Sequence, residues 1–475
     1  MLFPTVTFAL FFLIVLPVSW LLMPHRSAWR YFMLGASWFF YGYWNWRFVG
    51  LLILATVWNW GFGQFLHARH TEWLRRGALA VAVIGNLGVL GYFKYYGFFI
   101  TEFQNMLARF GVEQTPTIVT VTLPVGISFF TFQALSYVID VYRRDIESTD
   151  LLSFAVYLAF FPQLVAGPIV RASEFLPQLR HRADPRHVDS SRAFFLILSG
   201  LFKKVVLADF LAKMIVDPVF ADPSQSSALE TLIGVYGFAV QIYADFSGYT
   251  DIAIGVALLL GFRFPDNFNS PYTAESIQDF WRRWHMTLSR WLRDYLYVPL
   301  GGNRGSGLAT YRNLFLTMVI GGLWHGAAWN FVIWGAIHGT VMAIERYMKD
   351  QRRAQGLPEP PDTFARRWAR RFVTFQIVCF AWVFFRADTF GDAMEMLGRL
   401  VSGWGAPTEL VTPAVLLAIT YGIATQYVPR NAIAWMQATF SRLSPVWQGL
   451  ALAFGLLIID AMGPEGVSPF IYFAF

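Results

Sequence analysis

The chain has 475 residues, of which 56% are hydrophobic and only 14% are charged, and its net charge is +7. Soluble domains contain about 25% charged residues, so this composition excludes a soluble enzyme and predicts a polytopic protein of the lipid bilayer. The basic residues are scattered over short loops, which fits the positive-inside rule and argues against nucleic-acid binding. The single cysteine, Cys379, excludes an internal disulfide, and in its apolar segment it is an unreactive thiol.

Apolar segments recur along the chain at roughly the length that a membrane span needs, about 20 residues. Several segments are too short or too long for one crossing, so we expect an all-α fold with roughly ten to thirteen transmembrane or re-entrant helices. A polar patch is expected to break the segment at 230–262. A His and several glycines are expected to break the segment at 314–342. The candidate spans are residues 5–22, 31–46, 49–66, 77–93, 118–142, 151–170, 193–216, 230–262, 314–342, 372–385, 411–427 and 446–462.

The charged loops predict the topology. Arg26 and Arg30 follow the first candidate span, and the basic segment 69–76 lies two spans later, so both can be cytoplasmic with the N-terminus outside. Residues 346–371 form the longest polar segment and are a predicted cytoplasmic loop. This segment is the only plausible linker, and we therefore expect one domain over residues 1–475. Its parts are peripheral N-terminal spans (1–110), a core (118–345) and C-terminal spans (371–475).

Two apolar segments contain helix breakers and polar residues. Residues 123–133 begin with a Leu-Pro pair and include Gly126, and residues 161–169 contain two prolines. Pro is pre-organised for a helix start, and Gly allows close approach of another backbone. Each segment is consistent either with a re-entrant lining of a tunnel or with a simple kink.

Two carboxylates lie in the apolar segment at 241–251. Asp245 and Asp251, if buried, must be ion-paired, hydrogen-bonded or protonated. One interpretation is structural, with Asp245 accepting a hydrogen bond from a Tyr or Arg and fixing the packing of helices. The other places Asp245 in the wall of a substrate cavity beside the two histidines described next.

Residues 276–297 are too polar for a span and predict an amphipathic helix. At about 100° per residue, one side carries apolar and aromatic side chains, namely Trp281, Trp284, Leu288, Trp291 and Tyr295. The other side carries Gln278, Arg282, His285, Ser289 and Arg293. The helix either lies on the membrane surface and binds anionic lipid, or covers a substrate path that His285 faces. The presence of a His between arginines favours the second interpretation.

His325 lies inside the apolar run at 314–342. An ionisable group at membrane depth needs a polar partner or a water-filled cavity, and is a functional candidate by default. With His285 it forms the predicted catalytic pair. The sequence has no Gly-rich phosphate loop, zinc-ligand spacing or nucleophile elbow, and we expect no metal. The remaining histidines are predicted to be solvated or to serve packing: His25, His67, His70, His181, His187 and His338.

Together, these segments resemble the membrane-bound O-acyltransferase family, and most closely its bacterial O-acetylation branch. The similar stretches occur in the order of the family and are long enough to make the resemblance specific. They are residues 124–143, 160–171, 241–255, 280–304 and 321–339, with the terminal stretch 468–475.

The resemblance implies a helical fold around a central funnel and tunnel, in the bacterial inner membrane. The essential His of the family matches His325, in the motif Leu-Trp-His-Gly, and the second family position matches His285. Asp245 and Trp324 are included as substrate-binding candidates. The resemblance also implies acetyl-CoA as a cytoplasmic donor substrate, with no bound cofactor. It implies a periplasmic partner similar to SGNH hydrolases, which completes transfer to a sugar hydroxyl of a polysaccharide.

The chemistry of the residues agrees with that expectation. A neutral imidazole near pH 7 removes a proton from an alcohol that attacks a thioester, typically with a gain of about 10²–10⁴-fold. We assign His325 as the general base, and expect His285 to orient the reactants or to polarise the thioester carbonyl. Arg282 and Arg283 are expected to attract the donor phosphates. A covalent acyl-His intermediate is also consistent with these residues.

Three other functions fit part of the pattern. D-alanyl transfer to teichoic acid would use a carrier protein as donor. A transporter or channel would use the His pair as a proton relay and would need no acyl donor. A noncatalytic scaffold would only hold the periplasmic enzyme. The acceptor polysaccharide itself is left open, with alginate and peptidoglycan among those that fit.

Overall fold

The computed structural model describes residues 1–68, 70–111, 121–165, 167–180, 184–464, 466 and 468–471. Every regular element in these residues is helical, which confirms the all-α prediction. The chain forms two compact units. Unit 1 comprises Met1–Val188 with Val256–Phe264, and unit 2 comprises Asp189–Gly255 with Pro265–Phe475. Arg69, His181, the beginning of the predicted span at 118–142 and the last four residues of the stretch at 468–475 lie outside the described residues.

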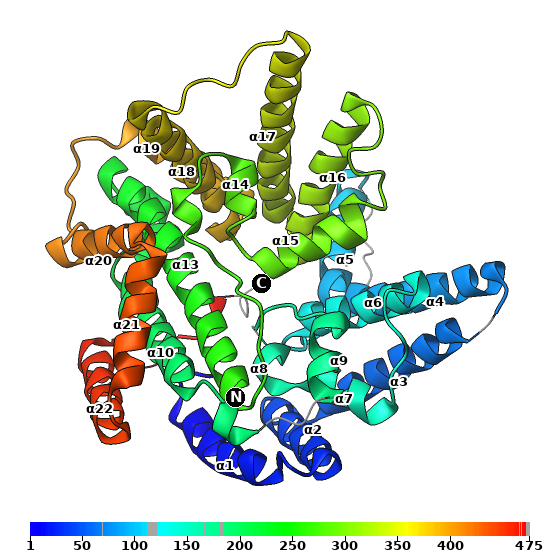
Figure 1. Ribbon diagram of the computed structural model, residues 1–475. Coiled ribbons are helices and arrows are strands. Elements are labelled where there is room, and N and C mark those ends of the chain that lie inside the picture. Colours follow the sequence, from blue (N-terminus) through cyan, green and yellow to red (C-terminus); the bar gives the residue numbers. More distant parts are fainter. Residues whose placement is uncertain are drawn as a thin grey trace. The chain divides into compact units, whose positions relative to one another are not determined.

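Unit 1 contains the N-terminal helices (Figure 1). The helical elements of its described residues follow one another in chain order. They are α1 (Val6–Leu22), α2 (Arg26–Gly42), α3 (Arg47–His67), α4 (Glu72–Leu90), η1 (Gly91–Tyr95), α5 (Tyr96–Arg109), α6 (Ile127–Arg143), α7 (Leu151–Ala159), α8 (Phe161–Leu164), α9 (Ala172–Arg180) and η2 (Pro185–His187).

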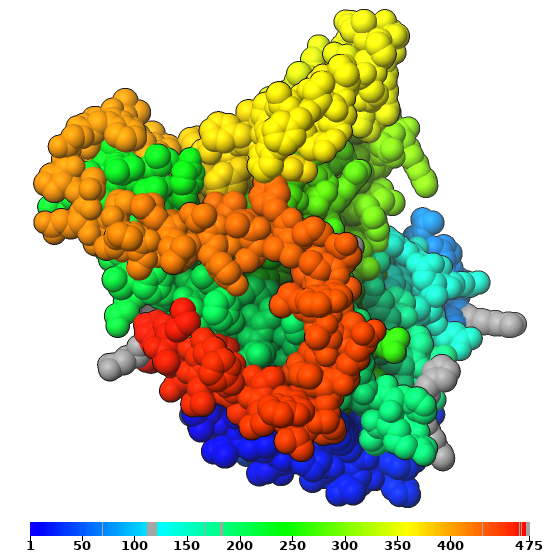
Figure 2. Space-filling view, turned by 60° about the vertical axis from the view of Figure 1, so that its left-hand side comes forward, coloured from blue at the N-terminus to red at the C-terminus, as the bar shows by residue number. Residues whose placement is uncertain are grey.

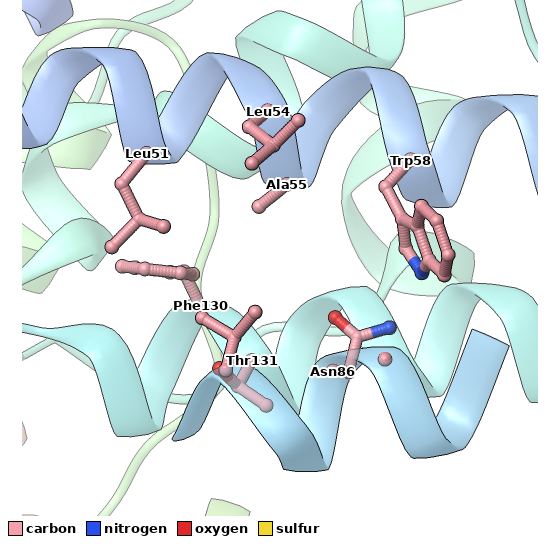
Figure 3. Close-up of a pocket in the computed structure, with 9 residues that line it drawn as sticks. Leu51, Leu54, Ala55, Trp58, Asn86, Phe130 and Thr131 are labelled. Atoms are coloured by element: carbon pink, nitrogen blue, oxygen red, sulfur yellow. The ribbon is translucent and has the colours of Figure 1, made fainter. Parts of the chain in front are cut away.

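Helices α3, α4 and α6 pack side by side, and their shared interface holds both a polar pair and an apolar groove. The amides of Asn59 and Asn86 satisfy each other through two hydrogen bonds of 3.0 and 2.8 Å. Beside them is a cavity of about 230 Å³, into which Leu54 and Trp58 project from α3 and Phe130 from α6 (Figure 3). A polar pair that completes its own hydrogen bonds can be buried among spans at little cost.

The two segments with helix breakers pack against each other in unit 1. Gly126 precedes α6 with a φ of +77°, a conformation that favours glycine. A Cβ at this position would lie 2.4 Å from the carbonyl oxygen of Leu164, the last residue of the one-turn helix α8. The breaks therefore allow two backbones to approach closely, and protein fills the space around them.

Unit 2 contains the remaining helices. They are α10 (Ser190–Leu201), η3 (Phe202–Ala208), α11 (Asp209–Leu211), η4 (Ala212–Val216), α12 (Asp217–Ala221), η5 (Pro223–Gln225), most of α13 (Ala228–Leu259), η6 (Pro271–Thr273), α14 (Ile277–Trp281), α15 (Met286–Leu292), η7 (Arg293–Tyr297), α16 (Gly307–His325), α17 (Trp329–Ala354), α18 (Phe364–Arg386), α19 (Phe390–Ser402), α20 (Pro413–Ala424), η8 (Thr425–Tyr427), α21 (Arg430–Arg442) and α22 (Pro445–Met462).

In unit 2, α16 and α17 form an antiparallel hairpin, and the C-terminal helices lie at the surface. Figure 2 shows α20 to α22, orange to red, on one face of this unit, where α21 and α22 contact α10. Trp435 of α21 is 69% exposed and Leu457 of α22 is 66% exposed. Such large apolar side chains are stable at a surface that faces lipid.

Five helical stretches among the described residues are long and apolar enough to cross a membrane. They are Arg47–His67, the continuous stretch Glu72–Arg109, Ala228–Leu259, Phe364–Arg386 and Pro445–Met462, and Val6–Leu22 is a shorter apolar helix. The protein is therefore a multi-pass membrane protein, as its composition predicts.

Two predictions about breaks in unit 2 are wrong. The segment at 230–262 is not interrupted by its polar patch, because α13 runs unbroken through it. Lysines pair with Asp245 and Asp251, so these carboxylates need no break in the backbone. The segment at 346–371 is largely helical rather than a loop, since α17 continues to Ala354 and the Thr363 hydroxyl caps α18. The predicted break at 314–342 is confirmed, between His325 and Trp329.

Candidate active site

The segment at 276–297 is not the single amphipathic helix that its periodicity predicts. The Ser276 side chain caps α14, which ends at Trp281, and a turn with His285 in the left-handed region (φ +41°) precedes α15. The turn changes the phase of the helix, so Arg282 is exposed whereas His285 is fully buried. The two therefore do not share a polar face, and the prediction that they do is wrong.

Asn267 holds the chain in this turn and fixes the orientation of the His285 ring. The Met286 N–H donates to the Asn267 carbonyl oxygen (2.9 Å), and the Thr287 N–H and hydroxyl donate to Asn267 Oδ1 (3.1 and 2.9 Å). His285 Nδ1 lies 3.3 Å from the same Oδ1. An oxygen that accepts these bonds requires Nδ1 to be the protonated nitrogen, which leaves the lone pair of the ring on Nε2.

The His285 ring is neutral at physiological pH, because burial lowers its pKa to about 3. A neutral ring with its proton on Nδ1 can accept a hydrogen bond or a proton at Nε2, but cannot donate from Nε2 to a thioester carbonyl. Of the two roles expected for His285, the geometry favours orientation of the reactants over polarisation of the carbonyl.

We expect His285→Ala to reduce acyl transfer strongly and His285→Asn to reduce it less. Asn tolerates the left-handed conformation and keeps a polar side chain at this position, whereas Ala does neither. Initial rates of CoA release by the two purified variants measure the difference. Activities of both variants close to that of the unmodified protein would indicate a purely structural turn.

His325 is the last residue of α16 and is almost fully buried among aromatic rings. Its ring centroid lies 5.0 Å from Trp324, 5.0 Å from Trp334 and 5.4 Å from Phe385. The next residue is Gly326, where a Cβ would lie 1.9 Å from the Phe331 ring. Only glycine lets the chain leave α16 here and begin α17 directly beside it.

Trp324 brings the predicted pair together within unit 2. Its ring lies 5.0 Å from His325 and 6.2 Å from His285, measured between ring centroids. Phe246 of α13 packs edge-on against His285 at 4.7 Å. The two histidines, distant in the sequence, therefore contact the same indole ring, which makes Trp324 a wall of the candidate site.

A cavity of about 700 Å³ lies beside His325 in unit 2. Gly326 and Phe385, which follow and contact His325, line one part of it. Lys204, Asp209 and Asp245 line another part, and residues 468–471 a third. The combination of apolar and charged walls suits a substrate that carries polar groups.

Asp245 lies where both interpretations of it placed it, but its ionic partner is a different one. It lines the cavity and is also ion-paired, but with Lys204 (2.8 Å) rather than with a Tyr or Arg. Lys204 also contacts Asp209 (2.8 Å), and the Ile471 N–H donates to Asp245 Oδ2 (2.8 Å). Lys204 and Asp209 were missed by the sequence analysis, although charged residues in the apolar segment at 193–216 were a usable signal.

The two arginines of the turn differ in their surroundings. Arg283 is half-buried, and its guanidinium contacts Asp279 (3.0 Å) and the Thr273 hydroxyl (3.3 Å). Arg282 is exposed. They precede His285 in the turn but do not lie with it in the buried site. Of the predicted site residues, the structure thus groups His325, His285 and Trp324, places Asp245 in the cavity wall, and leaves the two arginines outside.

Comparisons with known proteins place the chain in a family. The model of the membrane-bound O-acyltransferase family matches residues 92–385. The chain is 44% identical to a "probable alginate O-acetylase" of Azotobacter vinelandii, over 78% of this chain and 72% of that protein. It is 38% identical to a protein of the same name from Pseudomonas putida, over 98% of this chain and 99% of that protein. It is also 38% identical to the peptidoglycan O-acetyltransferase of Helicobacter pylori, over 77% of this chain and 72% of that protein. The chain belongs to the membrane-bound O-acyltransferase family and is a multi-pass membrane acyltransferase.

Proposed function

We propose that this acyltransferase moves an acetyl group from cytoplasmic acetyl-CoA across the bacterial inner membrane to a periplasmic protein that O-acetylates a cell-surface polysaccharide. The main observation in support is the buried His325, which stands where α16 ends, beside a cavity and one indole ring away from His285. The names of the relatives support a polysaccharide such as alginate or peptidoglycan as the final acceptor.

The proposed step balances without a bound cofactor or metal. His325 takes the proton of an acceptor hydroxyl while the hydroxyl oxygen forms a bond to the thioester carbonyl carbon. The carbon–sulfur bond then breaks, and the thiolate of CoA takes up the proton from the imidazolium. The aromatic walls exclude water, which limits hydrolysis of the thioester. His285, neutral and oriented by Asn267, assists as a hydrogen-bond acceptor.

Arg282→Ala is expected to raise the KM for acetyl-CoA more than it lowers kcat. A phosphate contact made equally in the ground and transition states changes binding alone. Arg283→Ala should raise KM as well, but should also lower thermal stability, because it leaves Asp279 without its guanidinium partner. Steady-state kinetics and thermal unfolding of both variants in detergent separate the two effects. A kcat defect in Arg282→Ala with unchanged KM would contradict the donor-binding role.

The partner is tested by reconstitution. With radiolabelled acetyl-CoA alone, the purified chain should release CoA slowly, by hydrolysis. A periplasmic SGNH hydrolase-like protein, together with the polysaccharide, should accelerate the release and transfer the label to the polysaccharide. Full labelling of the polysaccharide without the partner would contradict the relay.

Two matched reactions, one with acetyl-CoA and one with a D-alanyl thioester on a carrier protein, separate the alternatives. Preference for the D-alanyl thioester would favour D-alanyl transfer. His325→Ala serves as the inactive control in both reactions. Movement of the acceptor across vesicles without any release of CoA would favour a transporter.

A further inference from the structure

His338 is a third histidine near the candidate site, and it has no assigned role in the chemistry above. It lies in α17 and is fully buried, so of the solvated and packing roles expected for it only packing fits its position. Three aromatic rings surround it. Phe280 stacks on it at 6.1 Å with an angle of 7° between the planes, and the edge-on rings of Trp281 and Trp334 lie at 5.3 and 4.9 Å.

The polar atoms of this aromatic cage are not satisfied by the described part of the chain. Neither ring nitrogen of His338 has a hydrogen-bond partner there, nor does Nε1 of Trp281 or of Trp334. A buried polar atom without a partner costs free energy, and a Phe ring would fill the same space without that cost. A packing role alone therefore does not account for an imidazole, and these polar atoms are available to a group that the described residues do not supply.

The position of His338 indicates which group this is. Trp334 contacts both His338 (4.9 Å) and His325 (5.0 Å). His338 follows Trp334 by four residues, or about 6 Å along the helix axis, in the direction of the connection at 355–363. That connection lies in the predicted cytoplasmic segment. If that segment is cytoplasmic, as its charge predicts, a donor that moves along α17 toward His325 would meet the cage first.

We propose that His338, with the indole N–H groups of Trp281 and Trp334, forms a binding site for the amide groups in the pantetheine arm of the acyl donor. A secondary amide has one acceptor and one donor. The indole N–H groups donate to its oxygen, and a neutral imidazole both donates and accepts. This inference rests on the proposed function, which supplies a thioester donor from the cytoplasm. Coenzyme A and acyl carrier proteins both present this arm.

His338→Phe tests the site, because it keeps an aromatic ring in the cage and removes both nitrogens. We expect the KM for acetyl-CoA to rise about tenfold, the effect of losing one or two hydrogen bonds, with kcat reduced less than about twofold. The thermal unfolding temperature should stay the same or rise. His338→Gln, which keeps a donor and an acceptor, should give a KM between that of the unmodified protein and that of His338→Phe. An unchanged KM in His338→Phe, or a kcat defect alone, would overturn the proposal.

Phe280→Leu is the matched control for packing, since it removes the stacked ring and no polar atom. It should lower the unfolding temperature and change the KM less than about twofold, because no hydrogen bond to the donor is lost. A rise in KM as large as that of His338→Phe would assign both effects to packing and overturn the proposal.

A second donor separates this inference from the proposed function. The same variants are assayed with a D-alanyl carrier-protein thioester, which carries the same arm. If the unmodified chain uses only the carrier-protein thioester, acetyl-CoA is the wrong donor, while a raised KM for that thioester in His338→Phe still supports the site. If the unmodified chain uses acetyl-CoA and His338→Phe does so equally well, only the site is overturned.

Discussion

Replacing His325 by Ala is expected to abolish O-acetylation while the protein remains inserted and folded. His325 is the proposed base, and it stands at the end of α16 within contact of three aromatic rings. Loss of general base catalysis lowers a rate by about 10²–10⁴-fold, which is enough to remove detectable product. The measurement is the acetyl content of the polysaccharide in cells, together with CoA release by the purified variant.

Two controls separate chemistry from folding. His325→Gln keeps a polar side chain in the aromatic surroundings and should also be inactive, because an amide is not a base near pH 7. His187→Ala changes an exposed histidine in unit 1 and should leave activity unaffected. Acetyl levels in His325→Ala equal to those of the unmodified protein would remove His325 from the mechanism.

Lys204→Met is expected to cause a large loss of stability in unit 2. The Lys204 ammonium lies 2.8 Å from both Asp209 and Asp245, and all three side chains are at most 3% exposed. Removing one partner of a buried ion pair costs about 3–5 kcal/mol, because the remaining charges stay buried without compensation. Thermal unfolding in detergent, followed by circular dichroism, measures the loss.

The neighbouring lysine provides a matched control. Lys203 pairs with Asp251, and these side chains are 18% and 25% exposed, so water partly compensates their charges. Lys203→Met should therefore be less destabilising than Lys204→Met. Adding Asp209→Asn and Asp245→Asn to Lys204→Met should restore part of the stability, since neutral amides are less costly to bury than carboxylates. Equal losses in both lysine variants would contradict a special role for the buried triad.

The membrane class and the helical fold were predictable from the sequence, and the role of His325 stays a prediction. Apolar composition and the length of apolar runs are properties of consecutive residues, and they decide whether a segment can cross a bilayer. A histidine inside such a run is visible in the same way. The resemblance to the acyltransferase family, carried by several ordered motifs, added the reaction and is confirmed by the family match.

The surroundings of each polar residue depended on contacts between distant segments. Helical periodicity placed Arg282 and His285 on one face, but Asn267, eighteen residues before His285, holds the chain in a turn that separates them. Likewise, Asp245 was expected to bond a Tyr or Arg, whereas Lys204 from another helix neutralises it without breaking α13. Periodicity describes one helix at a time, and a bond from another segment can override it.

The aromatic cage around His338 also depends on contacts between distant segments. His338 lies in the same apolar run as His325, but the sequence showed no polar partner or family motif for it, and it was grouped with the loop histidines. In the structure, α14 supplies Phe280 and Trp281, and α17 supplies Trp334, so that a fully buried imidazole lies one ring away from His325. The hydrophobicity of a segment is the sum of its own residues and can be read locally. The partner of a buried polar atom is decided by which segments pack around it, and only the tertiary structure contains that information.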